Sequence, residues 1–209
     1  MRKLIESAVW SAGADAKREI EERWQAFEAV RMKDEDEWFS ELCFCLLTAN
    51  TSAEMGMRVQ ERLGYKGFAE SSESGLAEAL KGAGSRFYNR RAEYIALARR
   101  HNGKLKKVLG GMGNQFKMRE WLVKNVKGMG YKEASHFLRN TGHGDLAILD
   151  KHIISVLREH ELIGEFKGMG KRRYIAVEHV LRMAAGEAHM PLGKLDLYLW
   201  RCKTGKVLK

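Results

Sequence analysis

The sequence has almost no proline and few cysteines, and each shortage excludes a class of protein. Pro191 is the only proline, so little interrupts a helix. The three cysteines, at positions 43, 45 and 202, are odd in number and form no Cys-x-x-Cys pair. A disulfide framework in an oxidising compartment, a structural zinc and an iron–sulfur cluster are therefore not expected. We expect a reducing compartment and neither a metal nor another cofactor.

Long apolar runs are missing as well. The longest covers residues 42–47, which is far too short to span a bilayer. Charged residues interrupt the first six positions, so no signal-peptide core is present there. We therefore expect a cytoplasmic protein that makes no membrane contact.

Basic residues are in excess. The chain has 37 Lys and Arg against 27 Asp and Glu, which gives a net charge of +10 over 209 residues. Hydrophobic residues make up 44%, enough to build a core. The excess favours a polyanionic partner such as nucleic acid, although a soluble basic protein without such a partner has the same composition.

The spacing of apolar residues predicts an all-α fold. They recur at intervals of three and four, and no strict alternation exceeds about five residues. The clearest segments are Ile20/Trp24/Phe27, Ile95/Leu97/Ala98, Ala134/Phe137/Leu138 and Ile175/Val180/Leu181. Residues 70–75 are predicted to form a surface loop. The tripeptide Gly-Met-Gly recurs at 111–113, 128–130 and 168–170, and we interpret the three copies as separate corners between helices.

Residues 118–140 carry the most information. We predict a helix over 118–126, a tight turn over 127–130 and a second helix over 131–140. Gly128 and Gly130 allow unusual backbone angles and a close approach by a ligand, and Met129 is expected to fill the gap between the helices. The free N–H groups at the start of the second helix would bind a phosphate of DNA, whatever the DNA sequence. An ordinary corner between two helices remains the alternative for this turn alone.

Two residues beyond the turn, Lys132 and Asp150, indicate a type of chemistry. Asp150 comes eighteen residues after Lys132 and precedes an apolar stretch, where it can cap a helix. The pattern Gly-x-Gly-Tyr-Lys-x-x-Ala, with apolar-Asp-x-His at this distance, resembles the helix–hairpin–helix DNA glycosylase superfamily. The resemblance implies that Lys132 is the nucleophile and Asp150 the shared carboxylate. A neutral amine can attack C1′ of the deoxyribose, and a carboxylate stabilises the positive charge that builds on the sugar.

The resemblance extends to residues that would contact DNA. Members of the superfamily flip the damaged base and fill the hole with a polar wedge, and Asn50 matches the wedge position. A second corner, residues 84–92, resembles the family's second loop at the DNA surface. It makes Arg86, Arg90 and Arg91 candidates for binding phosphate or the orphaned base. Each of these four residues has an ordinary alternative, a turn asparagine or a solvated charge.

The C-terminal segment narrows the resemblance. It contains Trp200, ends in Lys209 and lacks a four-cysteine loop, and over most of its length the chain is similar to the archaeal-type 8-oxoguanine DNA glycosylase/AP lyases. This similarity implies that Lys209 reaches the flipped base and that Phe87 and Trp200 pack on its face. It also implies that His152 contacts a phosphate. Trp200 as a core aromatic and His152 as a surface histidine are the alternatives.

The sequence therefore predicts one glycosylase unit over 1–209, with a central helical lobe at 37–143 and a second lobe built from 1–36 and 144–209. The implied activity is excision of 8-oxoguanine from double-stranded DNA through a lysine Schiff base, followed by strand cutting. We expect a monomer, in a prokaryotic cytoplasm. Two alternatives stay open: the same chemistry on oxidised pyrimidines, and a non-catalytic DNA-binding module, against which the spacing of Lys132 and Asp150 argues.

Overall fold

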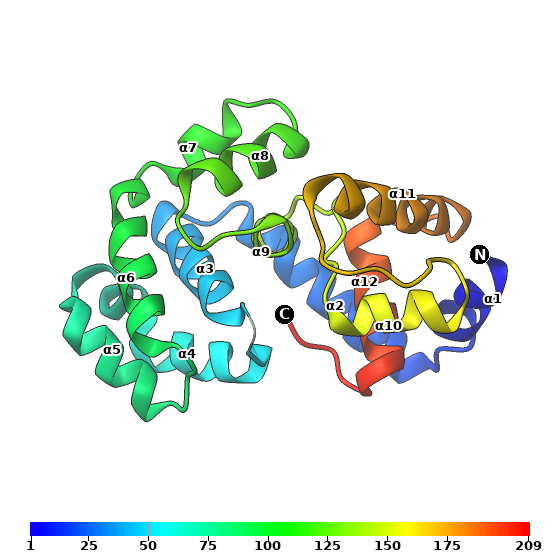
Figure 1. The fold of residues 1–209 in the computed structure, drawn as a ribbon, viewed down its shortest axis with the longest axis horizontal. Coiled ribbons are helices and arrows are strands. Elements are labelled where there is room, and N and C mark those ends of the chain that lie inside the picture. Colours follow the sequence, from blue (N-terminus) through cyan, green and yellow to red (C-terminus); the bar gives the residue numbers. More distant parts are fainter. Residues whose placement is uncertain (50) are drawn as a thin grey trace.

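Helices and the loops between them make up the whole of the described chain. The computed structural model describes residues 1–49 and 51–209, which contain no strand, so the all-α prediction is confirmed (Figure 1). Within these residues no helix has the length and apolar character needed to cross a bilayer. The helices are α1 Arg2–Ile5, η1 Glu6–Trp10, α2 Ala14–Val30, α3 Glu35–Thr48, α4 Ala53–Glu70, α5 Glu73–Gly82, α6 Tyr88–Ala98, η2 Arg99–His101, α7 Leu105–Gly110, α8 Gln115–Asn125, α9 Tyr131–Asn140, α10 Lys151–Glu159, α11 Lys171–Glu187 and α12 Leu192–Thr204.

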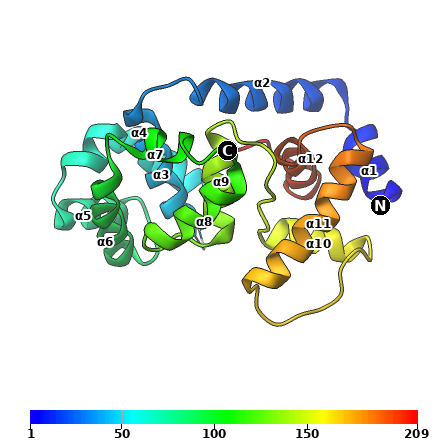
Figure 2. The ribbon, with the colours of Figure 1, turned by 90° about the horizontal axis from the view of Figure 1, so that it is seen from above.

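Two hydrophobic clusters organise these helices. The first takes its buried residues from positions 38–146, which run from α3 to the loop after α9, and the second from positions 4–27 and 147–199. Figure 1 shows the corresponding two groups of helices side by side, with the C-terminus between them. Helix α2 runs along one edge of the molecule, from beside α1 toward the start of α3 (Figure 2). The first and last helices thus belong to the second cluster, and the middle of the chain forms the first.

The predicted apolar faces are correct for two helices and partly wrong for two others. The predicted residues of α2 and α9 are all buried. Leu97 on α6 is 44% exposed and Ile175 on α11 is 43% exposed. At 100° per residue Leu97 lies about 200° from Ile95, so the two cannot share a face. On α11 the buried stripe instead follows Tyr174, Val177, Leu181 and Ala184, at the expected spacing.

Polar side chains fix where several helices begin. The Asp34, Ser52 and Asn114 side chains each accept a hydrogen bond from a backbone N–H three residues on. A side-chain cap of the same kind starts α5 at Glu73, so the prediction of a surface loop over 70–75 is wrong. Ser72 Oγ accepts from the backbone N–H of Gly75 at 3.1 Å, which starts α5 directly after α4.

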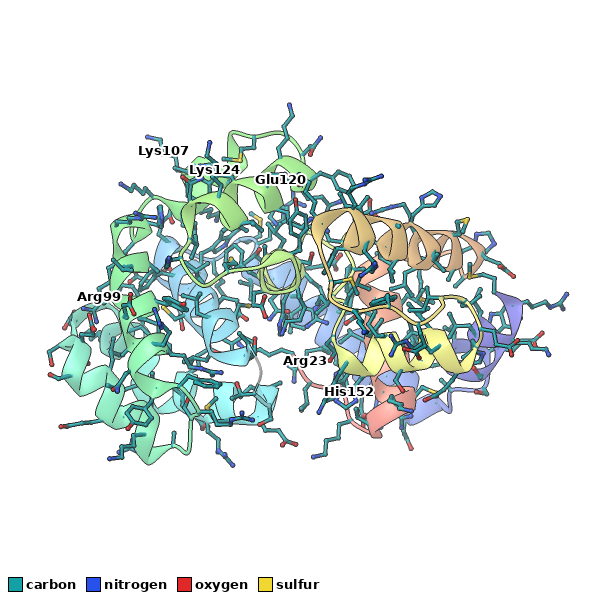
Figure 3. The ribbon with its side chains drawn as sticks, in the orientation of Figure 1. Arg23, Arg99, Lys107, Glu120, Lys124 and His152 are labelled. Carbon is teal, nitrogen blue, oxygen red and sulfur yellow. The ribbon has the colours of Figure 1, made fainter. Side chains whose placement is uncertain are left out.

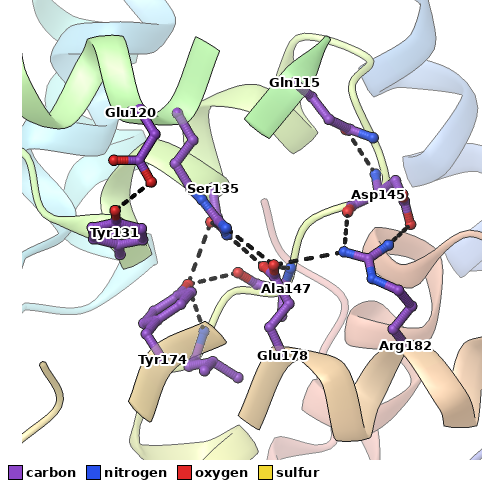
Figure 4. A network of polar contacts seen from close by, with 11 residues as sticks. Gln115, Glu120, Tyr131, Ser135, Asp145, Ala147, Tyr174, Glu178 and Arg182 are labelled. Atoms are coloured by element: carbon purple, nitrogen blue, oxygen red, sulfur yellow. Dashed lines mark hydrogen bonds and ion pairs between the residues drawn. The ribbon is translucent and has the colours of Figure 1, made fainter. Parts of the chain in front are cut away.

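A buried polar network joins α8 and α9 to α11 across the two clusters (Figure 4). Arg119 forms an ion pair with Glu178, and the two side chains are only 3% and 4% exposed. Arg119 Nη1 also donates to Ser135 Oγ at 3.2 Å, and Glu178 Oε2 accepts from the backbone N–H of Ala147 at 3.0 Å. Tyr174 donates to the Ala147 carbonyl at 2.6 Å. The network therefore holds the segment that leads toward Asp150 against both groups of helices.

We expect Glu178→Ala to lower the free energy of unfolding by about 3–5 kcal/mol, because it leaves the Arg119 guanidinium buried without its charge partner. Urea denaturation followed by circular dichroism measures the change. Glu187→Ala is the matched control, since Glu187 is exposed at the end of the same helix. A loss below about 1 kcal/mol for Glu178→Ala would show that the pair does not hold the two clusters together.

Candidate active site

The predicted hairpin is present, with its first helix starting three residues early. Helices α8 and α9 flank a turn in which Gly128 has a φ of +85°. A Cβ atom on Gly128 would lie 2.1 Å from the Tyr94 ring, so both the backbone angle and the packing require glycine. Met129 is buried, as predicted. Gly130 is the N-cap of α9 and no side chain caps it there, which leaves main-chain N–H groups for a ligand.

A cavity of about 920 Å³ lies between the two groups of helices. Its wall brings together Lys132 on α9, Asp150 at the start of α10 and Trp200 on α12. The other predicted residues on this wall are Arg86, Phe87, His152 and Lys209. Arg90 is not on it, and Asn50 falls outside the described residues. Among residues 1–49 and 51–209, no group of three or more His, Cys, Asp or Glu residues is placed to hold a metal ion.

Lys132 reaches the cavity from the second residue of α9. Its side chain is 23% exposed, and Nζ lies 3.0 Å from Oε1 of Glu133, whose side chain is 13% exposed. The amine is therefore half-buried on the wall and close to one carboxylate. It also stands in the first turn of α9, where no side chain caps the main-chain N–H groups, so a nucleic-acid phosphate bound there would bring a sugar toward it.

Asp150 caps α10, as the sequence predicts, and its carboxylate is held in one orientation. Oδ1 accepts hydrogen bonds from the backbone N–H groups of His152 at 2.8 Å and Ile153 at 2.9 Å. Oδ2 accepts from Trp200 Nε1 at 3.1 Å. Three donors on two oxygens fix the group against rotation, so the charge has a constant position in the cavity.

Two aromatic side chains face the same cavity. Trp200 is half-buried and touches His152 edge to face, with ring centroids 5.8 Å apart, so His152 lies beside α12 at the start of α10 (Figure 3). Phe87 is 60% exposed and has a left-handed backbone, with φ at 57°. A bulky residue seldom adopts this conformation, and such strain often marks a functional position. Both rings offer a surface on which a planar base can stack.

The arginines of the second corner differ in their surroundings. Arg86 is exposed and its guanidinium lies 5.3 Å from the Phe87 ring centroid. Arg90 is also exposed, with Nη1 3.6 Å from Glu93 Oε2. The prediction that Arg91 is available to DNA is wrong. Arg91 is buried and donates to Thr51 Oγ1 at 2.9 Å and to the backbone carbonyls of Leu47 and Ala49, so contacts within the protein occupy its guanidinium.

Several polar residues on the cavity wall were not predicted from the sequence, and the buried ionisable ones among them are His136, Arg139 and Asp196. All three are buried, and Arg139 Nη1 donates to Asp196 Oδ2 at 2.8 Å. A signal for them exists in the sequence. His136 and Arg139 follow Lys132 by four and seven residues, and Asp196 precedes Trp200 by four, so each shares a helical face with a predicted residue.

The buried groups have shifted pKa values. Burial, together with the charges of Arg139 and Lys132, lowers the pKa of His136 well below its usual value, so the ring is neutral at pH 7. Burial raises the pKa of Asp196 to about 7, and the neighbouring Asp150 adds to the rise while Arg139 opposes it. Among the carboxyl groups of the cavity, Asp150 is thus fixed by hydrogen bonds and Asp196 has a pKa raised by burial to about 7.

Known proteins similar to the chain point to one family. A family model described as 8-oxoguanine DNA glycosylase matches residues 20–190. The 8-oxoguanine DNA glycosylase/AP lyase of Methanocaldococcus jannaschii is 47% identical over 207 residues, which are 99% of each chain. That of Thermotoga maritima is 48% identical over 93% of this chain and 94% of its own.

Solved structures agree with these relatives. The crystal structure of the Methanocaldococcus jannaschii 8-oxoguanine glycosylase/lyase in complex with a 15mer DNA containing 8-oxoguanine matches with a TM-score of 0.95 and 45% identity, over 99% of this chain and 100% of that one. The 8-oxoguanine DNA glycosylase of Thermotoga maritima matches with a TM-score of 0.88 and 47% identity, over 93% of both chains. At 45% and 47% identity, these proteins are similar to this chain in sequence as well as in fold.

Proposed function

The chain belongs to the 8-oxoguanine DNA glycosylase family, and on this premise we propose that its cavity excises 8-oxoguanine from double-stranded DNA and then cuts the strand. The observation that carries the proposal is the common wall shared by Lys132 and Asp150. An amine nucleophile and a carboxylate facing one space are the two groups that this pair of reactions needs. The substrate is the lesion that the names of the relatives state.

We propose Lys132 as the nucleophile. Its Nζ forms a bond to C1′ of the flipped nucleotide while the glycosidic bond breaks, and the base leaves with the electron pair and a proton. The sugar ring opens to give a Schiff base between Nζ and C1′. Loss of a proton from C2′ then expels the 3′ phosphate, which cuts the strand. Glu133, 3.0 Å from Nζ, is placed to take the proton that the amine must lose before it attacks.

Asp150 has a different role, because three hydrogen bonds hold its carboxylate in one orientation. Positive charge develops on the sugar as the base departs, and a fixed carboxylate stabilises it without reorganisation. The N–H groups of His152, Ile153 and Trp200 supply that fixation. The negative charge is thus present before the reaction starts.

The remaining predicted residues divide into base contacts and DNA contacts. Phe87 and Trp200 supply stacking faces, each worth about 1–3 kcal/mol for a base, and Lys209 completes the base pocket on the same wall. The DNA contacts that we propose are Asn50 as the wedge, Arg86, Arg90 and His152 toward phosphates, and the main chain at Gly128 and Gly130. We assign residues 37–143 to the central lobe and residues 1–36 with 144–209 to the second lobe. We propose that the protein acts on DNA as a monomer, in a prokaryotic cytoplasm.

One assay tests the proposed function. The protein is incubated with a duplex that carries a single 8-oxoguanine, and free base and cut strand are measured separately. We expect both products, together with a covalent protein–DNA adduct when borohydride is present. A duplex with thymine glycol serves as the comparison substrate. Release of thymine glycol in preference to 8-oxoguanine would replace the substrate, and DNA binding without any base release would reduce the protein to a binding module.

A further inference from the structure

The last residues of the chain cross from one group of helices to the other. Helix α12 packs in the second hydrophobic cluster, and the segment after it reaches α3 and α4 of the first. Lys209 Nζ lies 2.7 Å from Oε2 of Glu41 on α3, and 4.5 Å from the centroid of the Phe44 ring. The Lys209 side chain is 17% exposed and that of Glu41 is 6% exposed. This ion pair is therefore nearly removed from solvent.

Glu41 has few other partners. Its Oε1 accepts from Asn140 Nδ2 at 2.6 Å, and Gln60 Nε2 approaches its Oε2 at 3.4 Å. Both are neutral amides, so among the described residues Lys209 supplies the one cation in direct contact with this carboxylate. A buried carboxylate is costly without such a partner. The position of the Lys209 side chain is thus tied to that of Glu41.

The same contacts continue to the cavity. Asn140 Oδ1 accepts from Arg139 Nε at 3.1 Å and Nη2 at 3.0 Å. Arg139 in turn donates to Asp196 Oδ2 at 2.8 Å, and Arg139, Asp196 and Lys209 all line the cavity. An unbroken row of buried polar contacts therefore connects Lys209 with the side of the cavity that holds Asp150 and Trp200. Glu41 is the member of this row that carries the charge opposite to Lys209.

We propose that Glu41 is a positioning residue that sets Lys209 against the cavity, so that it controls release of the damaged base without affecting cutting at an abasic site. The inference rests on the proposed function, in which Lys209 contacts the base. An abasic sugar offers no base to that contact, whereas Lys132 and Asp150 act on the sugar in both cases. The two half-reactions therefore separate a positioning role from general damage to the site.

The test compares Glu41→Gln with the unchanged protein under single-turnover conditions on two duplexes, one with 8-oxoguanine and one with a ready-made abasic site. We expect base release to fall about 100-fold, the effect of a misplaced positioning group, and abasic cutting to stay within about threefold. Glu159→Gln is the matched control. Glu159 pairs with Lys203 on α12, the two side chains are 53% and 33% exposed, and neither residue lines the cavity, so we expect little change.

A double variant shows whether Glu41 acts through Lys209. In a protein that already carries Lys209→Met, we expect Glu41→Gln to lower the rate of base release by less than about a further factor of two. The effects of two residues that act through one contact do not add. Multiplied losses would contradict the coupling. If Glu41→Gln does not fold, Glu41→Asp keeps the charge but shortens its reach, and we expect the same split between the two duplexes.

Three results would overturn the proposal or its basis in distinguishable ways. Base release at the unchanged rate in Glu41→Gln would remove Glu41 from the positioning role. Equal losses on both duplexes would show damage to the sugar chemistry or to the fold. Absence of 8-oxoguanine release by the unchanged protein would instead refute the proposed function, and with it the base contact on which the inference depends.

Discussion

Replacement of Lys132 by glutamine is expected to abolish the borohydride-trapped adduct with 8-oxoguanine DNA and to lower base release by at least about 1000-fold. Glutamine is close to lysine in length but has no amine, so neither the C1′ bond nor the Schiff base can form. DNA binding should persist, because the free N–H groups at the start of α9 belong to the main chain. Gel electrophoresis measures the trapped adduct, and base release is measured separately as the free base.

Lys203→Gln is the matched control for this change. Lys203 carries the same charge on α12 but pairs with Glu159 and does not line the cavity. We expect full adduct yield from it. An adduct of undiminished yield from Lys132→Gln would assign the nucleophile to another amine, and loss of DNA binding in that variant would assign Lys132 to phosphate contact instead.

The parts of the site that sequence predicts correctly are those set by neighbouring residues. The turn at Gly128 follows from a backbone angle that glycine favours, and the capping role of Asp150 follows from its place before an apolar stretch. Both depend on fewer than ten residues. The helix spacing that buries α9 is local in the same way, and it places Lys132 on a wall of the cavity.

The parts that sequence misses depend on partners far along the chain. Arg91 is a residue type that often contacts DNA, yet its guanidinium donates hydrogen bonds to backbone carbonyls some forty residues earlier. Glu41 stands in an apolar helix with no visible reason for a charge, because its partner Lys209 is 168 residues away. The periodicity of apolar residues indicates that a position faces the core, but it does not indicate which group from a distant part of the chain contacts that position. Long-range polar pairing is therefore the information that only the fold supplies.

Asp150→Asn is the second change with a large expected effect. Asparagine also caps helices, so α10 should remain and the melting temperature should fall only slightly. The carboxylate accepts three N–H groups on two oxygens, whereas an amide has one oxygen, so its NH₂ must face either Trp200 or the helix N–H groups. We expect base release to fall about 10²- to 10⁴-fold, because the negative charge that stabilises the sugar cation is lost.

Trp200→Phe separates the charge of Asp150 from its orientation. The substitution removes the Nε1 donor to Oδ2 but keeps the carboxylate, its two backbone donors and an aromatic face toward the cavity. If the charge is what matters, Trp200→Phe loses far less base release than Asp150→Asn in single-turnover assays on the same duplex. Comparable losses would mean that the direction of the carboxylate governs the reaction. A near-unchanged rate for Asp150→Asn would exclude Asp150 from stabilising the sugar, because no charge would then be needed at that place.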